Sequence, residues 1–258
     1  MQQPTPSPGE HEVSDKALLK ISGLHAYVEQ FYILQGVTLE VPSQGAVVLV
    51  GRNGAGKTTT LRCIMGLVPK CSGEIIFSGE DIKGLPPYEI ARRKITLVPE
   101  DQGIFALLNV GENILVSQRQ SSSRGELARR LDFTLSVFPD LKLAWNRKAG
   151  TLSGGQKQML AMARALANEN HLIMLDEPSK GLAPLLVKGL GNVIRQIQAN
   201  SAVLLVEQNF AFASTLGDTF SILSDGKTVL SGKMSELLEN SETQQRFLGV
   251  SANEGLRR

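Results

Sequence analysis

The sequence predicts an α/β fold: a parallel β-sheet covered by helices, with a smaller antiparallel β layer and a helical insertion. Short apolar runs at 46–50, 95–98, 171–175 and 202–206 alternate with stretches of helical periodicity, as the crossover connections of a parallel sheet require. A glycine-rich turn follows the first run and precedes a helical stretch. The chain has 258 residues, 42% of them hydrophobic, which is enough to bury a large core.

The amino-terminal part of the chain predicts a tail and an antiparallel layer. Residues 1–16 contain Pro4, Pro6 and Pro8 among polar neighbours, a composition typical of disorder, and we expect a second tail at 251–258. Segments 18–24 and 34–41 have the pattern of strands around a turn, and 73–77 that of a further strand. We therefore expect an antiparallel layer whose strands lie on both sides of the glycine-rich turn in the sequence.

Strand signals fade after Glu100 and helical ones replace them. The segment 126–138 carries Leu127, Leu131, Leu135 and Phe138 on one helical face. We expect a helical subdomain at about 101–160 within one domain at 17–250, and we expect Trp145 to belong to its core, because a lone tryptophan is more often core than a ligand-stacking residue.

The remaining elements follow from local patterns. Residues 157–166 have helix-forming composition, and apolar residues between Leu185 and Ile197 repeat at helical spacing. Near the carboxyl end, the apolar segments 220–223 and 228–230 flank Asp225-Gly226, which is a strong hairpin signal.

The glycine-rich turn matches the spacing of a phosphate-binding loop. Glycines allow successive backbone N–H groups to surround polyphosphate oxygens, and the following helix adds partial positive charge at its amino terminus. In such a loop Lys57 reaches the β- and γ-phosphates, the Thr58 hydroxyl is a ligand for Mg²⁺, and Thr59 faces the α-phosphate. The residues that we expect to bind the nucleotide here are Gly51, Arg52, Asn53, Gly54, Ala55, Gly56, Lys57, Thr58 and Thr59.

An acidic pair, Asp176 and Glu177, ends the apolar run 171–175. Ligands gather at the carboxyl ends of the strands of an open parallel sheet. Adjacent residues of an extended chain point in different directions, so Asp176 can hold Mg²⁺ while Glu177 polarises the attacking water. The alternative is an acidic turn before Pro178 without catalytic meaning.

Composition narrows the class of protein. The net charge of +2 gives no reason to expect a nucleic-acid surface, and no apolar run approaches the length of about 18 residues that a membrane span needs. The amino terminus lacks an apolar signal core, so we expect a soluble, cytoplasmic chain. Cys63 and Cys71 have no metal-ligand partners nearby, and a buried thiol is the expected state of Cys63.

A third segment, Leu152-Ser153-Gly154-Gly155-Gln156, completes a resemblance to the nucleotide-binding domain of ABC transporters over about 18–249. The resemblance implies the P-loop NTPase fold, with a RecA-like parallel sheet as its core. It also implies that Ser153, Gly154, Gly155 and Gln156 bind the γ-phosphate of ATP held by a second subunit. The segments 98–100, 177–184 and 205–209 look like the LivF-type ATP-binding subunit of bacterial branched-chain amino-acid importers.

The chain departs from the general pattern of this family at four positions. Glu100 stands where glutamine is usual, and a carboxylate can still meet Mg²⁺ or its water. Ala183 replaces an aspartate, and Gln208 replaces the switch histidine, so the residue beside the γ-phosphate can donate a hydrogen bond but cannot change its charge. Tyr27 is the residue that we expect to stack on adenine, with Phe31 and Tyr32 as alternatives.

The resemblance implies an ATPase in which Glu177, Lys57 and Gln208 are catalytic and Thr58, Glu100 and Asp176 bind Mg²⁺. The expected partners are two membrane-embedded permease subunits, a second ATP-binding subunit (an identical copy or a paralogue) and a solute-binding protein, with no nucleic acid. We expect uptake of branched-chain amino acids or related small polar solutes such as amides and urea, at the cytoplasmic face of the bacterial inner membrane. A soluble ABC ATPase of translation or DNA repair is the alternative, and an unrelated P-loop kinase or GTPase fits the 152–156 segment poorly.

The segment 103–108, Gly-Ile-Phe-Ala-Leu-Leu, is too apolar for an ordinary exposed loop. It lies between the segment of Glu100 and the helical insertion, where the resemblance implies a groove for a short permease helix. We expect Phe105 to contact the permease, with burial inside the subunit as the alternative.

Overall fold

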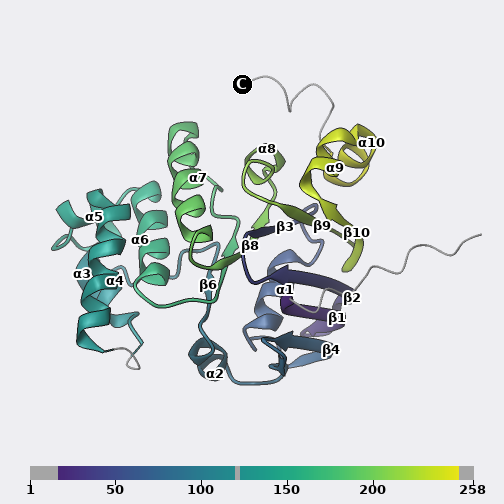
Figure 1. The fold of residues 1–258 in the computed structure, drawn as a ribbon, viewed down its shortest axis with the longest axis horizontal. Coiled ribbons are helices and arrows are strands. Elements are labelled where there is room, and N and C mark those ends of the chain that lie inside the picture. Colours follow the sequence, from purple (N-terminus) through teal and green to yellow (C-terminus); the bar gives the residue numbers. More distant parts are fainter. Residues whose placement is uncertain (1–16, 120–122, 250–258) are drawn as a thin grey trace, which may run out of the picture.

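A computed structural model describes residues 17–119 and 123–249, so the tails expected at 1–16 and 251–258 lie outside the described residues. Two β-sheets and the helices around them form the fold (Figure 1). None of the helices in the described ranges combines the length and the hydropathy that a membrane crossing requires.

The larger sheet has six strands in the order β10-β9-β3-β8-β7-β6. All neighbouring strands are parallel except the antiparallel pair β9 and β10. The prediction of a parallel sheet is confirmed, and the strands fall on the apolar runs: β3 (Ala46–Val50), β6 (Ile95–Val98), β7 (Leu172–Asp176), β8 (Ala202–Glu207), β9 (Thr219–Ser224) and β10 (Lys227–Lys233). Asp225 and Gly226 have φ angles of 50° and 74° between β9 and β10, as the hairpin signal predicts.

The smaller sheet is antiparallel, with the order β2-β1-β4-β5. Its strands are β1 (Ala17–Val28), β2 (Phe31–Pro42), β4 (Lys70–Phe77) and β5 (Glu80–Asp81). They run longer than predicted, because pairing continues where the apolar pattern stops: Tyr27 still pairs with Tyr32 near the hairpin tip. On β1 the buried residues are Leu19, Ile21, Leu24 and Ala26, so one face of this sheet packs inward.

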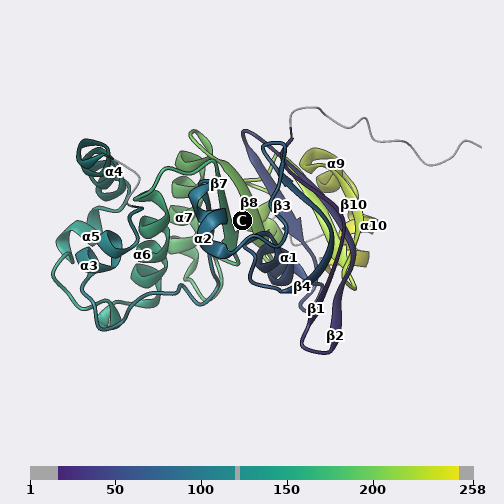
Figure 2. The same cartoon turned by 90° about the horizontal axis from the view of Figure 1, so that it is seen from below.

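Helices α3 to α6 gather on one side of the molecule, away from the strands of the antiparallel sheet (Figures 1 and 2). The helical character predicted after Glu100 is present, although the grouping into a subdomain at about 101–160 stays a prediction. Trp145 packs against the core in this region. The helix bounds are α1 (Lys57–Ile64), α2 (Pro87–Arg92), α3 (Val110–Val116), α4 (Arg124–Val137), α5 (Pro139–Leu143), α6 (Gly154–Leu166), α7 (Pro184–Gln198), α8 (Phe210–Ala213), α9 (Met234–Glu239) and α10 (Ser241–Thr243), with a 3₁₀ turn at Ala149–Thr151 and a π turn at Gln244–Leu248.

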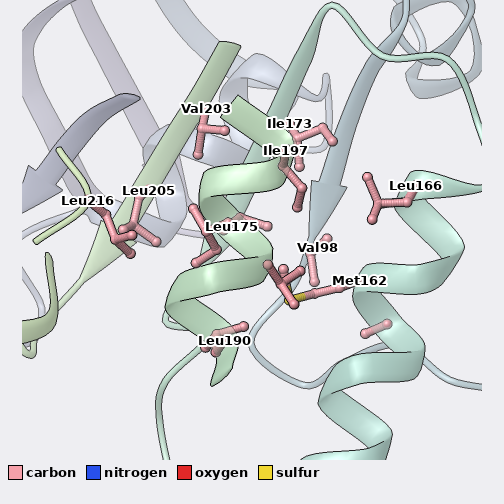
Figure 3. Packing of buried hydrophobic residues seen from close by; sticks show 14 of the residues in the cluster. Val98, Met162, Leu166, Ile173, Leu175, Leu190, Ile197, Val203, Leu205 and Leu216 are labelled. Carbon is pink, nitrogen blue, oxygen red and sulfur yellow. The ribbon is translucent and has the colours of Figure 1, made fainter. Parts of the chain in front are cut away.

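The central strands β3, β7 and β8 are buried along their whole length, which explains why they are apolar up to the acidic residues that end β7 and β8. On β3, Val48 packs into one hydrophobic cluster and Val47 into the other. The first cluster joins the sheet to α6 and α7, and Figure 3 shows Met162 and Ile197 of these helices beside Leu175 of β7. The second cluster joins the sheet to α1 and the antiparallel layer. Both clusters together hold the carboxyl ends of β3, β7 and β8 in fixed register.

Cys63 lies in the second cluster, 2% exposed and free. Burial raises the pKa of its thiol to about 12, so it behaves as a small apolar side chain at neutral pH. The prediction of a buried thiol is confirmed.

Candidate functional site

The phosphate loop connects the carboxyl end of β3 to α1. Gly56 caps the helix with a φ of 103°, a left-handed conformation that glycine adopts without strain. A Cβ at Gly56 would lie 2.6 Å from Leu34 of β2, and one at Gly51 would meet the backbone oxygen of Leu223. The loop therefore needs glycine both for its backbone angles and for the close approach of neighbouring strands.

Lys57 is held inside this loop. Its side chain is 5% exposed, and its Nζ donates hydrogen bonds to the carbonyl oxygens of Gly51 at 2.9 Å and Arg52 at 3.3 Å. The same Nζ lies 3.5 Å from Oε1 of Glu177. A buried ammonium fixed at the amino terminus of a helix is a preformed site for an anion.

Asp176, the last residue of β7, is hydrogen-bonded to Thr58 in the first turn of α1. The Thr58 hydroxyl donates to Oδ1 of Asp176 at 3.1 Å, and Asp176 is 3% exposed. Burial raises the pKa of Asp176 to about 6; the Thr58 hydrogen bond opposes this rise, the charges of Glu177 and Glu100 add to it, and Lys57 opposes it. A desolvated carboxylate among other carboxylates is stabilised by a bound cation.

The donor set fits Mg²⁺ bound together with phosphate. A hydroxyl and a carboxylate are hard oxygen ligands of the kind that Mg²⁺ prefers, and the ion usually takes its other ligands from water and phosphate. Within 17–119 and 123–249, no three or more histidine, cysteine, aspartate or glutamate side chains are grouped so that they alone hold a metal. The site is therefore suited to a metal that arrives with its substrate.

Glu177 does not continue the strand, contrary to the expectation that the acidic pair is extended. Its φ is 46°, a left-handed conformation, and its N–H donates to the carbonyl oxygen of Val206 on β8 at 2.9 Å. The change of direction after Asp176 sets the two carboxylates against different partners, Thr58 for Asp176 and Lys57 for Glu177. The two carboxylates still face different partners. A turn of the backbone produces this difference, not the alternation of side chains along a strand.

A pocket of about 390 Å³ lies over the phosphate loop. Of the predicted site residues, Glu100, Glu177 and most of the phosphate loop line this pocket. Ile33 and Lys180 also line it, although the sequence did not single them out as ligands. Its lining residues are Ile33, Asn53, Gly54, Gly56, Lys57, Thr58, Thr59, Glu100, Glu177 and Lys180. Arg52 and Ala55 line instead a second pocket of about 250 Å³, beside Arg246 and Phe247.

The structure does not bring Tyr27, the residue predicted to stack on adenine, to the pocket. Tyr27 stacks on Tyr32, with ring centroids 4.6 Å apart and planes at 14°, and neither ring lines the pocket. The pairing of β1 with β2 shifts register between Ala26 and Tyr27, and both rings are exposed. Ile33 of β2 lines the pocket in its place.

The 153–156 segment begins α6 and does not line the pocket of its own chain. The Ser153 hydroxyl accepts from the N–H of Gln156 at 3.3 Å, and the Gln156 side chain accepts from the N–H of Ser153 at 3.1 Å. This capping box leaves Ser153 and Gly154 exposed at the helix start. The segment is therefore available to a ligand or partner outside the subunit.

Gln208 is exposed and follows β8, whose last residue Glu207 pairs with Val50, just before the phosphate loop. It does not line the 390 Å³ pocket. The structure thus puts Gln208 at the same sheet edge as the phosphate loop, and its role as the switch residue stays a prediction.

Glu207 is a buried carboxylate at this sheet edge that no sequence motif singles out. It is 2% exposed; its Oε1 accepts from the N–H of Ser179 at 3.0 Å and its Oε2 from the N–H of Asn209 at 3.3 Å. Burial raises the pKa of Glu207. This carboxylate joins the turn after Glu177 to the segment of Gln208, and an acidic residue ending an otherwise buried strand was its only signal in the sequence.

Comparison with known proteins agrees with this geometry. The ABC transporter family model matches residues 34–180. The chain is 36% identical over 233 residues to the high-affinity branched-chain amino acid transport ATP-binding protein BraG of Pseudomonas aeruginosa, covering 90% of this chain and 100% of the relative. It is 34% identical to the probable branched-chain amino acid transport ATP-binding protein LivF of Archaeoglobus fulgidus, covering 90% and 99%.

A relative with another transport role also matches. The lipopolysaccharide export system ATP-binding protein LptB of Acidithiobacillus ferridurans is 31% identical, covering 90% of this chain and 97% of the relative.

Among solved structures, an ATP-binding subunit of an ABC transporter superimposes with a TM-score of 0.76 at 28% identity, covering 92% of this chain and 97% of the other. A dimeric ATP-binding cassette in a post-hydrolysis state, bound to ADP and phosphate, has a TM-score of 0.73 at 26% identity and covers 84% and 98%. The fold is that of the P-loop NTPases, and the chain belongs to the ABC transporter family, as one of its ATPase subunits.

Proposed function

We propose that this chain is the ATP-binding and ATP-hydrolysing subunit of an importer for branched-chain amino acids or related small polar solutes. The observation that carries the proposal is the match over 90% of the chain to BraG and LivF, at 36% and 34% identity. Glu100, the 177–184 segment and Gln208 agree with that branch.

In the proposed mechanism, one task falls to each of Lys57, Thr58, Asp176, Glu100 and Glu177. Lys57 leaves the loop carbonyls and Glu177 and binds the β- and γ-phosphates. Thr58 and Asp176 hold Mg²⁺, with Glu100 as a further ligand or water contact; the metal, when bound, neutralises charge on the phosphate oxygens. Glu177, released by Lys57, accepts a hydrogen bond from the attacking water and polarises it.

Two further segments act at the γ-phosphate. Gln208 donates a hydrogen bond from its side-chain amide to the γ-phosphate after the site has closed. The 153–156 segment binds nucleotide held by a second subunit, because its first residues, Ser153 and Gly154, are exposed and the segment lies outside the pocket of its own chain. The proposed assembly is therefore a dimer of ATP-binding subunits, identical or paralogous, with two nucleotides between them.

The proposed location is peripheral, on the cytoplasmic face of the bacterial inner membrane, with two permease subunits and a solute-binding protein as partners. Phe105 and Leu107 are 49% and 86% exposed in the segment expected to contact the permease. Asn113 fixes this segment, since its side chain accepts from the N–H of Phe105 at 2.8 Å and donates to the carbonyl of Phe105 at 3.0 Å. A rigid loop with exposed apolar side chains suits a docking surface.

The alternative of a soluble ATPase of translation or DNA repair is not favoured. Such proteins usually carry a second cassette or a long coiled-coil insertion, and the longest helix in the described residues is α7, with 15 residues.

Partner capture and solute uptake test the proposal together. A tagged full-length chain is purified from detergent-solubilised membranes of its own host. Uptake of labelled leucine, isoleucine, valine, urea and short amides is measured with and without the chain. We expect co-purification of membrane-embedded subunits and loss of uptake in its absence. Membrane partners with unchanged uptake of these amino acids, urea and short amides would refute the importer role and favour export; ribosomes or DNA in the purified complex would favour the soluble alternative.

A further inference from the structure

Lys180 forms part of the phosphate pocket, and the proposed mechanism gives it no task. Its Nζ lies 2.6 Å from Oε1 of Glu100 and 3.7 Å from Oε2 of Glu177. The other carboxylate oxygen of Glu177, Oε1, lies 3.5 Å from Nζ of Lys57. Each oxygen of Glu177 therefore faces a different ammonium, and Lys180 bridges two carboxylates.

The backbone of Lys180 is fixed although its side chain is 59% exposed. Its N–H donates to the carbonyl of Glu177 at 3.1 Å, and the preceding residue, Ser179, is tied to the buried carboxylate of Glu207 at 3.0 Å. Glu100 beside it raises the pKa of Lys180, so the side chain stays charged at neutral pH. A lysine with a fixed backbone and an exposed ammonium group can exchange one carboxylate partner for another while the loop keeps its conformation.

Glu100 has two uses that oppose one another. Its Oε1 accepts from Lys180, and the same carboxylate is needed at Mg²⁺ if Glu100 is a ligand or water contact of the metal. An ammonium and a divalent cation repel each other, so they compete for the negative charge of one carboxylate. The pair with Lys180 is solvent-exposed, so its interaction is weak and an exchange for Mg²⁺ is easy.

Resting on the proposed metal role of Asp176 and Glu100, we propose that Lys180 is a positioning residue that holds Glu100 in the nucleotide-free pocket and releases it when Mg²⁺ enters with ATP. Lys180 then remains beside Glu177 after Lys57 has moved to the phosphates. As an internal competitor of Mg²⁺, Lys180 sets the Mg²⁺ concentration at which the site fills.

A Mg²⁺ titration of nucleotide binding tests this inference. The full-length chain and its variants are titrated with Mg²⁺ at a fixed concentration of a fluorescent ATP analogue, and the half-saturating Mg²⁺ concentration is compared. Lys180→Gln should lower it about two- to fivefold, the range expected from the loss of one exposed ion pair. Lys180→Arg should restore the wild-type value, because a guanidinium also pairs with Glu100. Lys188→Gln, an exposed lysine on α7, is the matched control and should shift nothing.

A double variant at Lys180 and Glu100 distinguishes competition for the Glu100 carboxylate from a general effect of the Lys180 charge on Mg²⁺ binding. In a Glu100→Gln background, Lys180→Gln should no longer change the half-saturating Mg²⁺ concentration, since the carboxylate for which Lys180 and Mg²⁺ compete is absent. An unchanged value in Lys180→Gln alone, or an equal shift in both backgrounds, would overturn the inference while leaving the ATPase assignment intact. A wild-type chain that binds the analogue equally with and without Mg²⁺ would instead overturn the proposed metal site, and this inference with it.

Discussion

The buried carboxylate of Asp176 predicts that the proposed metal site destabilises the protein when neither metal nor nucleotide is bound. Its pKa is about 6 in the fold, against 3.8 for the free side chain. A difference of about 2 units corresponds to roughly 3 kcal/mol of unfavourable free energy when Asp176 is ionised. Asp176→Asn keeps an acceptor for Thr58 and removes the charge, so it should stabilise the protein in the absence of nucleotide and metal.

The sign of the pH dependence follows from the direction of the shift. A raised pKa means that the folded state binds the proton more tightly than the unfolded state, so ionisation weakens the fold as pH rises from about 4 to 6. The penalty is complete above about pH 6 and absent well below pH 4. The advantage of Asp176→Asn should therefore be about 3 kcal/mol at pH 8 and only about 1 kcal/mol at pH 4.5.

Urea unfolding of both proteins at pH 8 and pH 4.5 measures this difference, and Mg²⁺ with nucleotide should then stabilise the wild type but much less the variant. Asp132→Asn on α4 is the matched control, because Asp132 is exposed. An advantage of Asp176→Asn that is equal at the two pH values, or absent at both, would show that the reasoning from burial is wrong.

Three further predictions concern the proposed site. Glu177→Gln should retain ATP binding and lose nearly all turnover, since an amide cannot accept a proton from water; turnover within about threefold of wild type, measured by phosphate release, would remove Glu177 from that role. Ile33→Ala should weaken ATP binding by a few-fold through loss of apolar contact at the pocket wall, while Tyr27→Ala leaves it unchanged in calorimetric titration; the reverse order would return the adenine contact to Tyr27. Phe105→Asp should leave the ATPase activity of the isolated subunit intact and abolish co-purification with the permease, whereas an unfolded variant, detected by circular dichroism, would indicate a core role.

The sequence predicted the strand, loop and helix around the pocket because their chemistry is local. A strand, a glycine-rich loop and a helix are contiguous in the chain, so the spacing of Gly51, Gly56 and Lys57 defines a phosphate cradle without knowledge of distant residues. The central strands β3, β7 and β8 were equally predictable, because burial along their whole length makes them apolar up to their last residue. These features depend on neighbours in sequence.

Only the tertiary structure decided which side chains meet. Ile33 lines the pocket, whereas the Tyr27 and Tyr32 rings stack on each other outside it, where the pairing of β1 with β2 shifts register. Lys180 meets Glu100 across 80 positions in the chain, through the packing of the turn after β7 beside the segment after β6. Glu177 owes its orientation to a left-handed backbone tied to Val206. Such contacts depend on the registers of separate strands, which local sequence patterns do not encode.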